Sequence, residues 1–147
     1  KKKIMATDGV INGTMFGVYA GGTKIAYATS ASISMNHNLR DTSTKDSGGW
    51  RDQLEGQRDW EVSVEGMLIF TALGGGAISG ETMNELYTSY IYSRSVFELK
   101  FNTAVTGDIG WTGQAFMTSL SADTPNEDSS TWSASFSGTG ELVQAAV

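Results

Sequence analysis

Apolar residues recur at every second position along several stretches of this chain, and that period constrains the fold more than any other feature of the sequence. In the clearest stretch, from Asp59 to Phe70, Trp60, Val62 and Val64 alternate with polar residues before both faces become apolar. A period of two places alternate side chains on opposite faces of a β-strand, so one face of this strand is expected in a core. Shorter stretches of the same kind lie at positions 14–20, 23–28, 31–39, 97–102, 115–120 and 132–138. Eighteen glycines and a single proline suit strands joined by tight turns.

The period changes to that of an α-helix in one place, between positions 81 and 94. The apolar residues at helical spacing are Met83, Leu86, Tyr87, Tyr90 and Ile91. Thr82 and Glu85 have the spacing of a capping box at the start of this helix. The sequence therefore predicts a mainly β protein: an antiparallel β-sandwich or barrel with one flanking α-helix at 81–94 and a long inter-strand loop, in a single domain over residues 1–147.

That long loop is predicted over residues 40–59, because no period continues through them. Mixed charges surround two glycines and Trp50 in this segment. Loops of such length without structure of their own are usually functional or disordered, and the presence of Trp50 and Leu54 argues against disorder. We therefore expect the loop to become ordered against another surface. The polar, glycine-rich residues 1–13 are expected to form an N-terminal arm.

Composition removes several classes of function. The chain has 10 Lys and Arg against 16 Asp and Glu, a formal net charge of −6 at pH 7, which makes it a poor candidate for gripping phosphate backbones. It has no cysteine and one histidine, which excludes disulfides, thiolate sites and zinc sites built from several histidines. No apolar run approaches the ~20 residues of a membrane helix, so we expect no membrane binding by the chain itself.

The remaining polar residues do not form a recognisable catalytic or metal site. Glu61 and Glu65 are roughly 13 Å apart along one strand at ~3.3 Å per residue, which exceeds the separations of about 5 to 9.5 Å between paired glycosidase carboxylates. His37 continues the apolar alternation of its strand and is interpreted as a structural histidine. The acidic residues of the long loop miss the calcium-loop spacing; they are Asp41, Asp46, Asp52 and Glu55. We therefore predict no catalytic residue, no metal and no cofactor.

Trp50 is the best candidate for a binding residue. It lies in a charged, glycine-flanked loop, whereas the other tryptophans lie on or beside periodic strands. Because buried Trp and Arg side chains dominate association energies, we favour Trp50 as an interface anchor. The alternative is that Trp50 folds back over the edge of its own domain.

The stretch from Thr42 to Gly66 resembles a signature of phage major tail tube proteins. It reads TSTKDSGGWRDQLEGQRDWEVSVEG: a Thr-rich Lys-Asp-Ser-Gly-Gly-Trp segment, then Leu-x-Gly, then a Trp that opens an alternating strand. The run Thr29–Asn36 is similar to the strand that enters the long loop in those proteins, and Ala134–Leu142 resembles their last strand. A single helix between strands fits the same family.

The resemblance implies a structural protein of the virion tail, and not an enzyme. Tail tube proteins form hexameric rings whose sheets join into a continuous barrel, and the rings stack into a conduit for DNA ejection into the host cell. The implied partners are copies of the chain itself and other tail proteins: tape measure, tail tip or baseplate, terminator and, where present, sheath. DNA would pass through the lumen without specific binding. The implied location is the virion tail, assembled in the bacterial host cytoplasm.

By the same resemblance, the long loop contacts the neighbouring subunit or ring, with Trp50 and Leu54 as anchors and its charges paired across the contact. The residues expected at this inter-subunit or inter-ring interface are Lys45, Asp46, Gly48, Gly49, Trp50, Arg51, Asp52, Leu54, Glu55 and Arg58, together with Met5 and Asp8 of the N-terminal arm. The candidate lumen-facing residues on polar strand faces are Glu61, Ser63, Glu65 and Glu98. An acidic wall would repel DNA phosphates and let the DNA slide.

Two other functions stay open from the residues alone. A lectin-like, ligand-binding β-sandwich would use Trp50 as a stacking platform and would be a monomer. A small hydrolase would need a pocket that joins His37 to two carboxylates.

Overall fold

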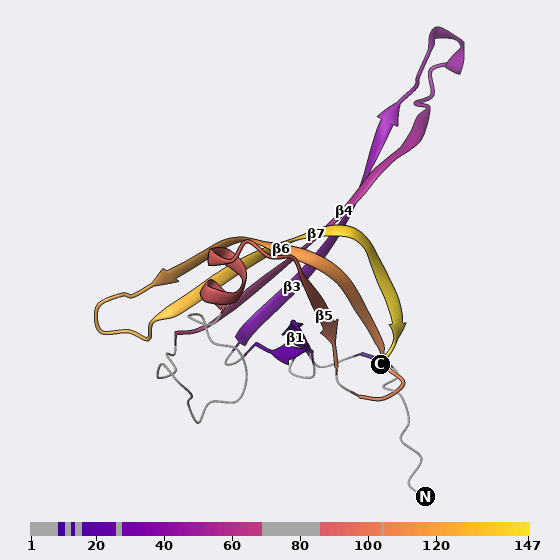
Figure 1. The fold of residues 1–147 in the computed structure, drawn as a ribbon. Coiled ribbons are helices and arrows are strands. Elements are labelled where there is room, and N and C mark those ends of the chain that lie inside the picture. The colour runs from indigo at the N-terminus through magenta and orange to yellow at the C-terminus, as the bar shows by residue number, and fades with distance from the viewer. Residues whose placement is uncertain (1–8, 11–12, 14–15, 26–27, 69–85, 104) are drawn as a thin grey trace, which may run out of the picture.

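The computed structural model describes residues 9–10, 13, 16–25, 28–68, 86–103 and 105–147 (Figure 1). The strands within these residues are β1 (Gly17–Ala20), β2 (Thr23–Lys24), β3 (Ala28–Asp41), β4 (Gln53–Met67), β5 (Phe97–Asn102), β6 (Ile109–Asp123) and β7 (Thr131–Ala146), and the short helical elements are η2 (Lys45–Ser47) and η3 (Tyr87–Tyr92). The strands predicted at 31–39, 97–102, 115–120 and 132–138 are confirmed. No helix in the described part of the chain is long and apolar enough to span a membrane.

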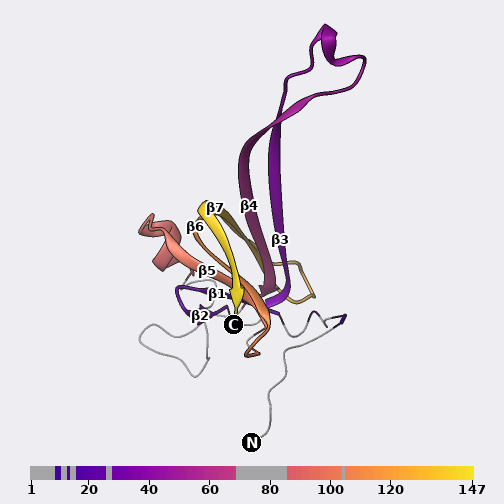
Figure 2. The ribbon, with the colours of Figure 1, turned by 90° about the vertical axis from the view of Figure 1, so that its right-hand side faces the viewer.

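All seven strands belong to one sheet, in the order β2-β1-β5-β6-β7-β4-β3. Each neighbouring pair is antiparallel. The mainly β, antiparallel class predicted from the sequence is confirmed, and the structure specifies the arrangement as a single sheet that is curved and open (Figures 1 and 2). Residues of β1 and β4, which are not neighbours in the sheet, share one core cluster because the sheet curves around that core.

The core lies on one face of the sheet. In β4 the buried residues alternate with exposed ones from Trp60 to Met67, as the period of two predicts. The element η3 lies over this face, where Leu86 at its N-terminal end is fully buried and the ring of Tyr90 lies 4.0 Å from that of Phe97. The sheet therefore covers its apolar side with its own curvature and with one short helical segment.

Trp60 packs against β6 and β7 at two glycines. A Cβ atom on Gly138 would lie 2.0 Å from the Trp60 ring, and one on Gly113 would lie 2.5 Å from it. The indole Nε1 donates a hydrogen bond of 3.3 Å to the carbonyl of Gly140. The large ring fits at this position because β7, and β6 beyond it, both have a glycine where the ring lies.

The helix predicted at 81–94 is described only in its second half. Residues 81–85, including the proposed capping box, lie outside the described residues. From Tyr87 to Tyr92 the chain forms a π-helix, which has one more residue per hydrogen-bonded ring than the predicted α-helix. Leu86 and Tyr90 still face the core, four residues apart, so the apolar spacing identified the buried side correctly.

Candidate functional site: a hairpin arm and a polar sheet face

A two-stranded arm extends from the body of the protein (Figures 1 and 2). Strand β4 pairs with β7 only from Met67 to Glu61, and beyond that point its partner among the described residues is β3 alone. We call residues 36–59 the arm. None of these residues is buried. The arm therefore has no hydrophobic core of its own.

The irregular part of the arm is shorter than the predicted loop over residues 40–59. Strand β3 continues to Asp41 and β4 begins at Gln53, so only residues 42–52 lie between the strands. The prediction was wrong at both ends because the arm is exposed on both faces. Its strands therefore show no apolar alternation, which is the pattern that identified the other strands.

A β-bulge shapes the arm near its base. The register between β3 and β4 shifts between the pairs His37–Arg58 and Leu39–Glu55, so two residues of β4, Gly56 and Gln57, lie opposite the single residue Asn38 of β3. A Cβ atom on Gly56, on the opposite strand, would lie 2.0 Å from the carbonyl oxygen of Asn38. Because no other residue type lacks a Cβ, this close approach requires glycine at position 56.

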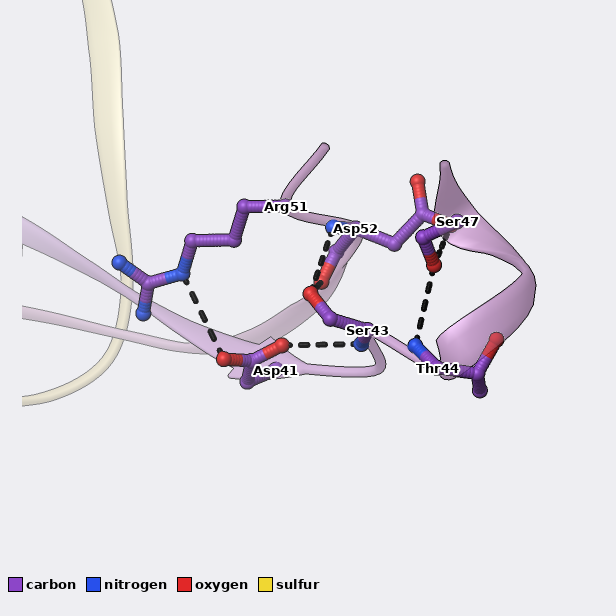
Figure 3. A network of polar contacts seen from close by, with 6 residues as sticks. All are labelled: Asp41, Ser43, Thr44, Ser47, Arg51 and Asp52. Carbon is purple, nitrogen blue, oxygen red and sulfur yellow. Dashed lines mark hydrogen bonds and ion pairs between the residues drawn. The ribbon is translucent and has the colours of Figure 1, made fainter. Parts of the chain in front are cut away.

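The tip of the arm, residues 42–52, is organised by short hydrogen bonds (Figure 3). Thr44 caps η2, its backbone N–H donating to the Ser47 hydroxyl at 3.0 Å in a capping box. The turn ends at Gly48, whose φ of 63° is left-handed and suits glycine. The Trp50 backbone N–H then donates to the carbonyl of Ser47 at 3.1 Å. The backbone that carries Trp50 therefore has a defined shape in the single chain.

A second set of contacts closes the tip (Figure 3). The Asp41 carboxylate accepts a 2.9 Å hydrogen bond from the Ser43 backbone N–H and lies 3.5 Å from Nε of Arg51. The Ser43 hydroxyl accepts a 2.8 Å bond from the Asp52 backbone N–H. The hydrogen bonds from Ser43, and then the charge of Arg51, hold the pKa of Asp41 below its ordinary value of 3.8. Sequence reasoning did not assign Asp41 and Ser43 to the site, although Asp followed two residues later by Ser is a usual signal of such a turn.

The predicted anchors are exposed. The Trp50 side chain is 83% exposed and Leu54 is 60% exposed. Trp50 lies in the turn that joins β3 to β4, and with so much of its side chain exposed it does not cover the edge of its own domain. An indole displayed in this way on a structured turn is a feature of a binding surface.

The structure brings most of the predicted interface residues together on the arm. They are Lys45, Asp46, Gly48, Gly49, Trp50, Arg51, Asp52, Leu54, Glu55 and Arg58. Met5 and Asp8 lie outside the described residues. Arg51 was expected to pair with another subunit, but it pairs within the chain with Asp41.

The four candidate lumen residues share the face of the sheet opposite the core. Glu61, Ser63 and Glu65 project from β4 on this face, since the residues between them are buried. Glu98 of β5 lies opposite Gln114 of β6 and is on the same face, because its own neighbours along β5 are core residues. We call this the polar face.

Hydroxyl groups extend the polar face across four strands. Three cross-strand rows run over β3, β4, β7 and β6 in that order: Ser34, Glu61, Ser137 and Phe116; Ser32, Ser63, Ser135 and Ser119; Ser30, Glu65, Ser133 and Ser121. Two hydroxyls in the last row, Ser121 and Ser133, lie 2.6 Å apart and hydrogen bond to each other. The face is therefore polar, and acidic along β4.

A groove opens at the base of the arm, where β4 leaves β7. Its volume is about 840 Å³, and residues from β3, β4, β6 and β7 line it. His37, Asp59 and Glu141 are among them, the histidine and carboxylates that a hydrolase would need. No hydrogen bond joins the imidazole to either carboxylate among the described residues, and no hydroxyl or thiol lines the groove as a nucleophile. No group of metal-ligating side chains occurs in the described part of the chain.

The fold is shared with proteins of several tail-like assemblies. A chain in the virion of a native gene transfer agent particle is 21% identical, covers 93% of this chain and 100% of its own length, and superimposes with a TM-score of 0.73. A chain of the SPP1 tail tube is 11% identical, covers 94% of this chain and 80% of its own length, and has a TM-score of 0.70. A chain of the PVC sheath–tube complex, an extracellular contractile injection system, is 17% identical over 90% of this chain and 88% of its own length, with a TM-score of 0.59.

Sequence comparison identifies the family. No curated protein sequence matches the chain at a significant level. The family model described as phage tail tube protein matches residues 18–144, which include the arm, the polar face and the core strands. The chain therefore belongs to the phage tail tube protein family.

Proposed function

We propose that this protein assembles into hexameric rings that stack into a tail tube, the conduit through which DNA leaves the particle for the host cell. The observation that carries the proposal is the arm, an extended hairpin without a buried residue and with an exposed tryptophan at its tip. Contact with another molecule would bury the surface that the arm leaves in water. Membership of the tail tube family supports copies of the same chain as that molecule.

Two open strand edges support lateral joining of subunits into a ring. The edge of β3 away from β4 has no strand partner among the described residues. The edge of β6 away from β7 is also unpaired there from Phe116 to Asp123, because β5 pairs with β6 only as far as Ala115. Open edges favour pairing with another chain. Four antiparallel strands, β3, β4, β7 and β6, lie between these edges. Because this number is even, β3 of one copy lies antiparallel to β6 of the next, and the sheet continues without a break in pattern.

A ring of six such subunits is the closed form of this contact. An interface between unlike surfaces closes into a ring when its rotation fits. The gene transfer agent tail with the similar fold has C6 symmetry. Six copies would join the four-strand segments into one barrel, and the part of the polar face on β3, β4, β7 and β6 would line its lumen.

The polar face suits a passage for DNA. Glu61 and Glu65 of β4 give it negative charge, with Ser63 and the other hydroxyls between them, whereas Glu98 lies on β5, outside the four-strand segment, and is in an ion pair with Lys100 at 3.1 Å. Like charge repels DNA phosphates, so the DNA passes without specific binding. The apolar face would then lie on the outside of the barrel, covered by η3.

The arm provides the contact between subunits of neighbouring rings. Trp50 and Leu54 are its anchors, and Lys45, Asp46 and Glu55 carry charges that are not in ion pairs among the described residues. Met5 and Asp8 of the N-terminal segment belong to the same proposed interface. A tube of this kind works with other tail proteins: a tape measure, a terminator, a baseplate or tail tip and, in contractile systems, a sheath. Similar folds occur in a sheath–tube complex, a terminator and a baseplate.

Electron microscopy of the purified protein tests the proposal. We expect the wild-type chain to form rings and tubes in the bacterial cytoplasm and in concentrated solution. Trp50→Ala should leave single rings or monomers with an unchanged circular dichroism spectrum. Tyr92→Ala is the matched control, because Tyr92 is 75% exposed on η3, away from the arm, and its loss should not shorten the tubes. A wild-type chain that stays monomeric at high concentration would contradict the tube and favour the lectin-like alternative.

A further inference from the structure

The groove at the base of the arm lies between two strand edges that diverge. Strands β4 and β7 are paired up to Glu61 and Ser137. From there β4 continues into the arm, while β7 turns away toward the body and has Gly140 in a left-handed conformation with a φ of 82° (Figure 1). On the sides that face the groove, neither β4 beyond Trp60 nor β7 beyond Ser137 has a strand partner among the described residues.

The groove is apolar on the side that continues the core face. Met35 of β3 is 52% exposed there, although it lies opposite the buried Trp60. Trp111 of β6 and Leu142 of β7 are only partly buried at the edge of the core. The volume of about 840 Å³ is within the range of sites that enclose a whole small molecule, so the groove has room for an indole together with part of its turn.

The apolar group that matches this groove lies at the opposite end of the same hairpin. Trp50 is 83% exposed on a turn that the hydrogen bonds of the tip hold in shape. Residues at the base of the arm line the groove, whereas Trp50 lies in the turn between β3 and β4 at the other end of the extended hairpin (Figure 2), so Trp50 cannot fill the groove of its own chain. The groove and the tip are thus complementary surfaces at two distant places on one molecule.

We propose that the groove is the receptor for the tip of the arm of a second copy, with the indole of Trp50 seated against Met35, Trp111 and Leu142. The inference rests on the proposed function and names the surface that the arm of the neighbouring ring binds. Burying a tryptophan removes about 150–250 Å² of surface from water, which makes it the main source of affinity.

The charges at the two surfaces fit the same contact. Arg58 and Glu141 line the groove and are in no ion pair among the described residues. The tip presents Lys45 and Asp46, which are likewise in no ion pair there. Asp59 also lines the groove, and Asp52 also lies in the tip, neither of them in an ion pair among the described residues. Lys45 of the tip is thus able to pair with Glu141 or Asp59, and Asp46 or Asp52 with Arg58, and these opposite-charge contacts select the orientation of the tip.

A contact between two unlike surfaces extends by repetition. Each copy that offers its tip to one neighbour keeps its groove for another, so the contact builds an open stack and does not stop at a dimer. This is the geometry that successive rings of a tube need.

Mixing two variants tests the pairing of tip with groove. Trp50→Ala removes the indole of the tip and leaves the groove unchanged. Met35→Glu places a charge in the apolar part of the groove and leaves the tip unchanged. We expect each variant alone to sediment as unstacked particles, and the mixture to give a species of twice the mass that grows no further. Because Met35 is half exposed, Met35→Glu should fold, and a circular dichroism melt like that of the wild type checks this. A mixture that does not associate, although both variants are folded, overturns the inference.

Photo-crosslinking identifies the residues that the tip contacts. With Trp50 replaced by p-benzoylphenylalanine, an aromatic group stays at the tip, and mass spectrometry identifies the peptides that it reaches. We expect cross-links to peptides with Met35 and Leu142 in assembled tubes and none in monomers. Tubes that cross-link only elsewhere overturn the groove as receptor and leave the tube function intact, whereas a wild-type chain without tubes refutes the function itself.

Discussion

Replacing Gly138 with alanine should destabilise the body of the protein through Trp60. The new methyl carbon would lie 2.0 Å from Cε2 of the Trp60 ring, far inside contact distance. The ring cannot move freely toward β6, because it already lies close to Gly113. It is 5% exposed, so it cannot swing into solvent without leaving the core.

The magnitude follows from three effects. Forcing a methyl group into a packed core costs about 1–3 kcal/mol. Moving the ring breaks the hydrogen bond from Nε1 to the carbonyl of Gly140, and leaving such a partly buried donor unpaired costs about 1–3 kcal/mol. Alanine reduces the entropy of the unfolded chain, which returns about 0.4–1 kcal/mol. We therefore expect the free energy of unfolding to fall by about 3 kcal/mol, or the Tm by about 6–12 °C at roughly 2–4 °C per kcal/mol.

Urea denaturation of the monomeric fraction, followed by circular dichroism, measures this loss. Gly13→Ala is the matched control, because a Cβ there meets no atom within 4 Å and the change should stay within about 0.5 kcal/mol. A double-mutant cycle with Trp60→Leu isolates the cause. In the Trp60→Leu background, Gly138→Ala should be close to neutral. Equal losses in both backgrounds would refute the steric argument.

Two further predictions concern the arm. Gly56→Ala should stop tube assembly while the Tm of the body changes little, because the new Cβ would meet the carbonyl oxygen of Asn38 at 2.0 Å in an arm that makes no core; electron microscopy and a thermal melt separate the two effects, and normal tubes would contradict the required close approach. Folding lowers the pKa of Asp41, so its contacts stabilise the tip above pH 3.8 and weaken as the pH falls through the lower folded value. The Ser43 amide resonance should follow that titration in NMR spectra, and Asp41→Asn should abolish the pH dependence; a folded pKa at or above 3.8 would contradict it.

The sequence predicted the elements that face the core and failed where no face is buried. The alternation through Trp60, Val62 and Val64 located β4 in the body, because burial of one face imposes the period of two. The same strand from Gln53 to Asp59 was assigned to a loop. None of these residues is buried on either face. Backbone hydrogen bonding to β3 does not require any alternation of apolar and polar side chains, so the sequence does not reveal this part of the strand.

The apolar alternation also could not predict which residues far apart in the sequence lie close together in space. The polar positions Glu61 and Glu98 were both selected, but only the register through β7 and β6 places them on one face. From the sequence, Gly138 was interpreted only as one position of an alternating strand. Its role depends on the Trp60 ring that packs against it. The groove could not be predicted, because it exists where two strands far apart in sequence separate.

The arm projects from the body in a single direction, and a stack of rings built through it would therefore have a polarity. One end of such a filament would present a ring of arms without a bound partner, and the other end a ring of empty grooves. A protein that starts the filament must then have a different shape from one that finishes it, and subunits would join the two termini at different rates. The direction of growth would thus be encoded in every subunit, with no external template needed to distinguish head from tail.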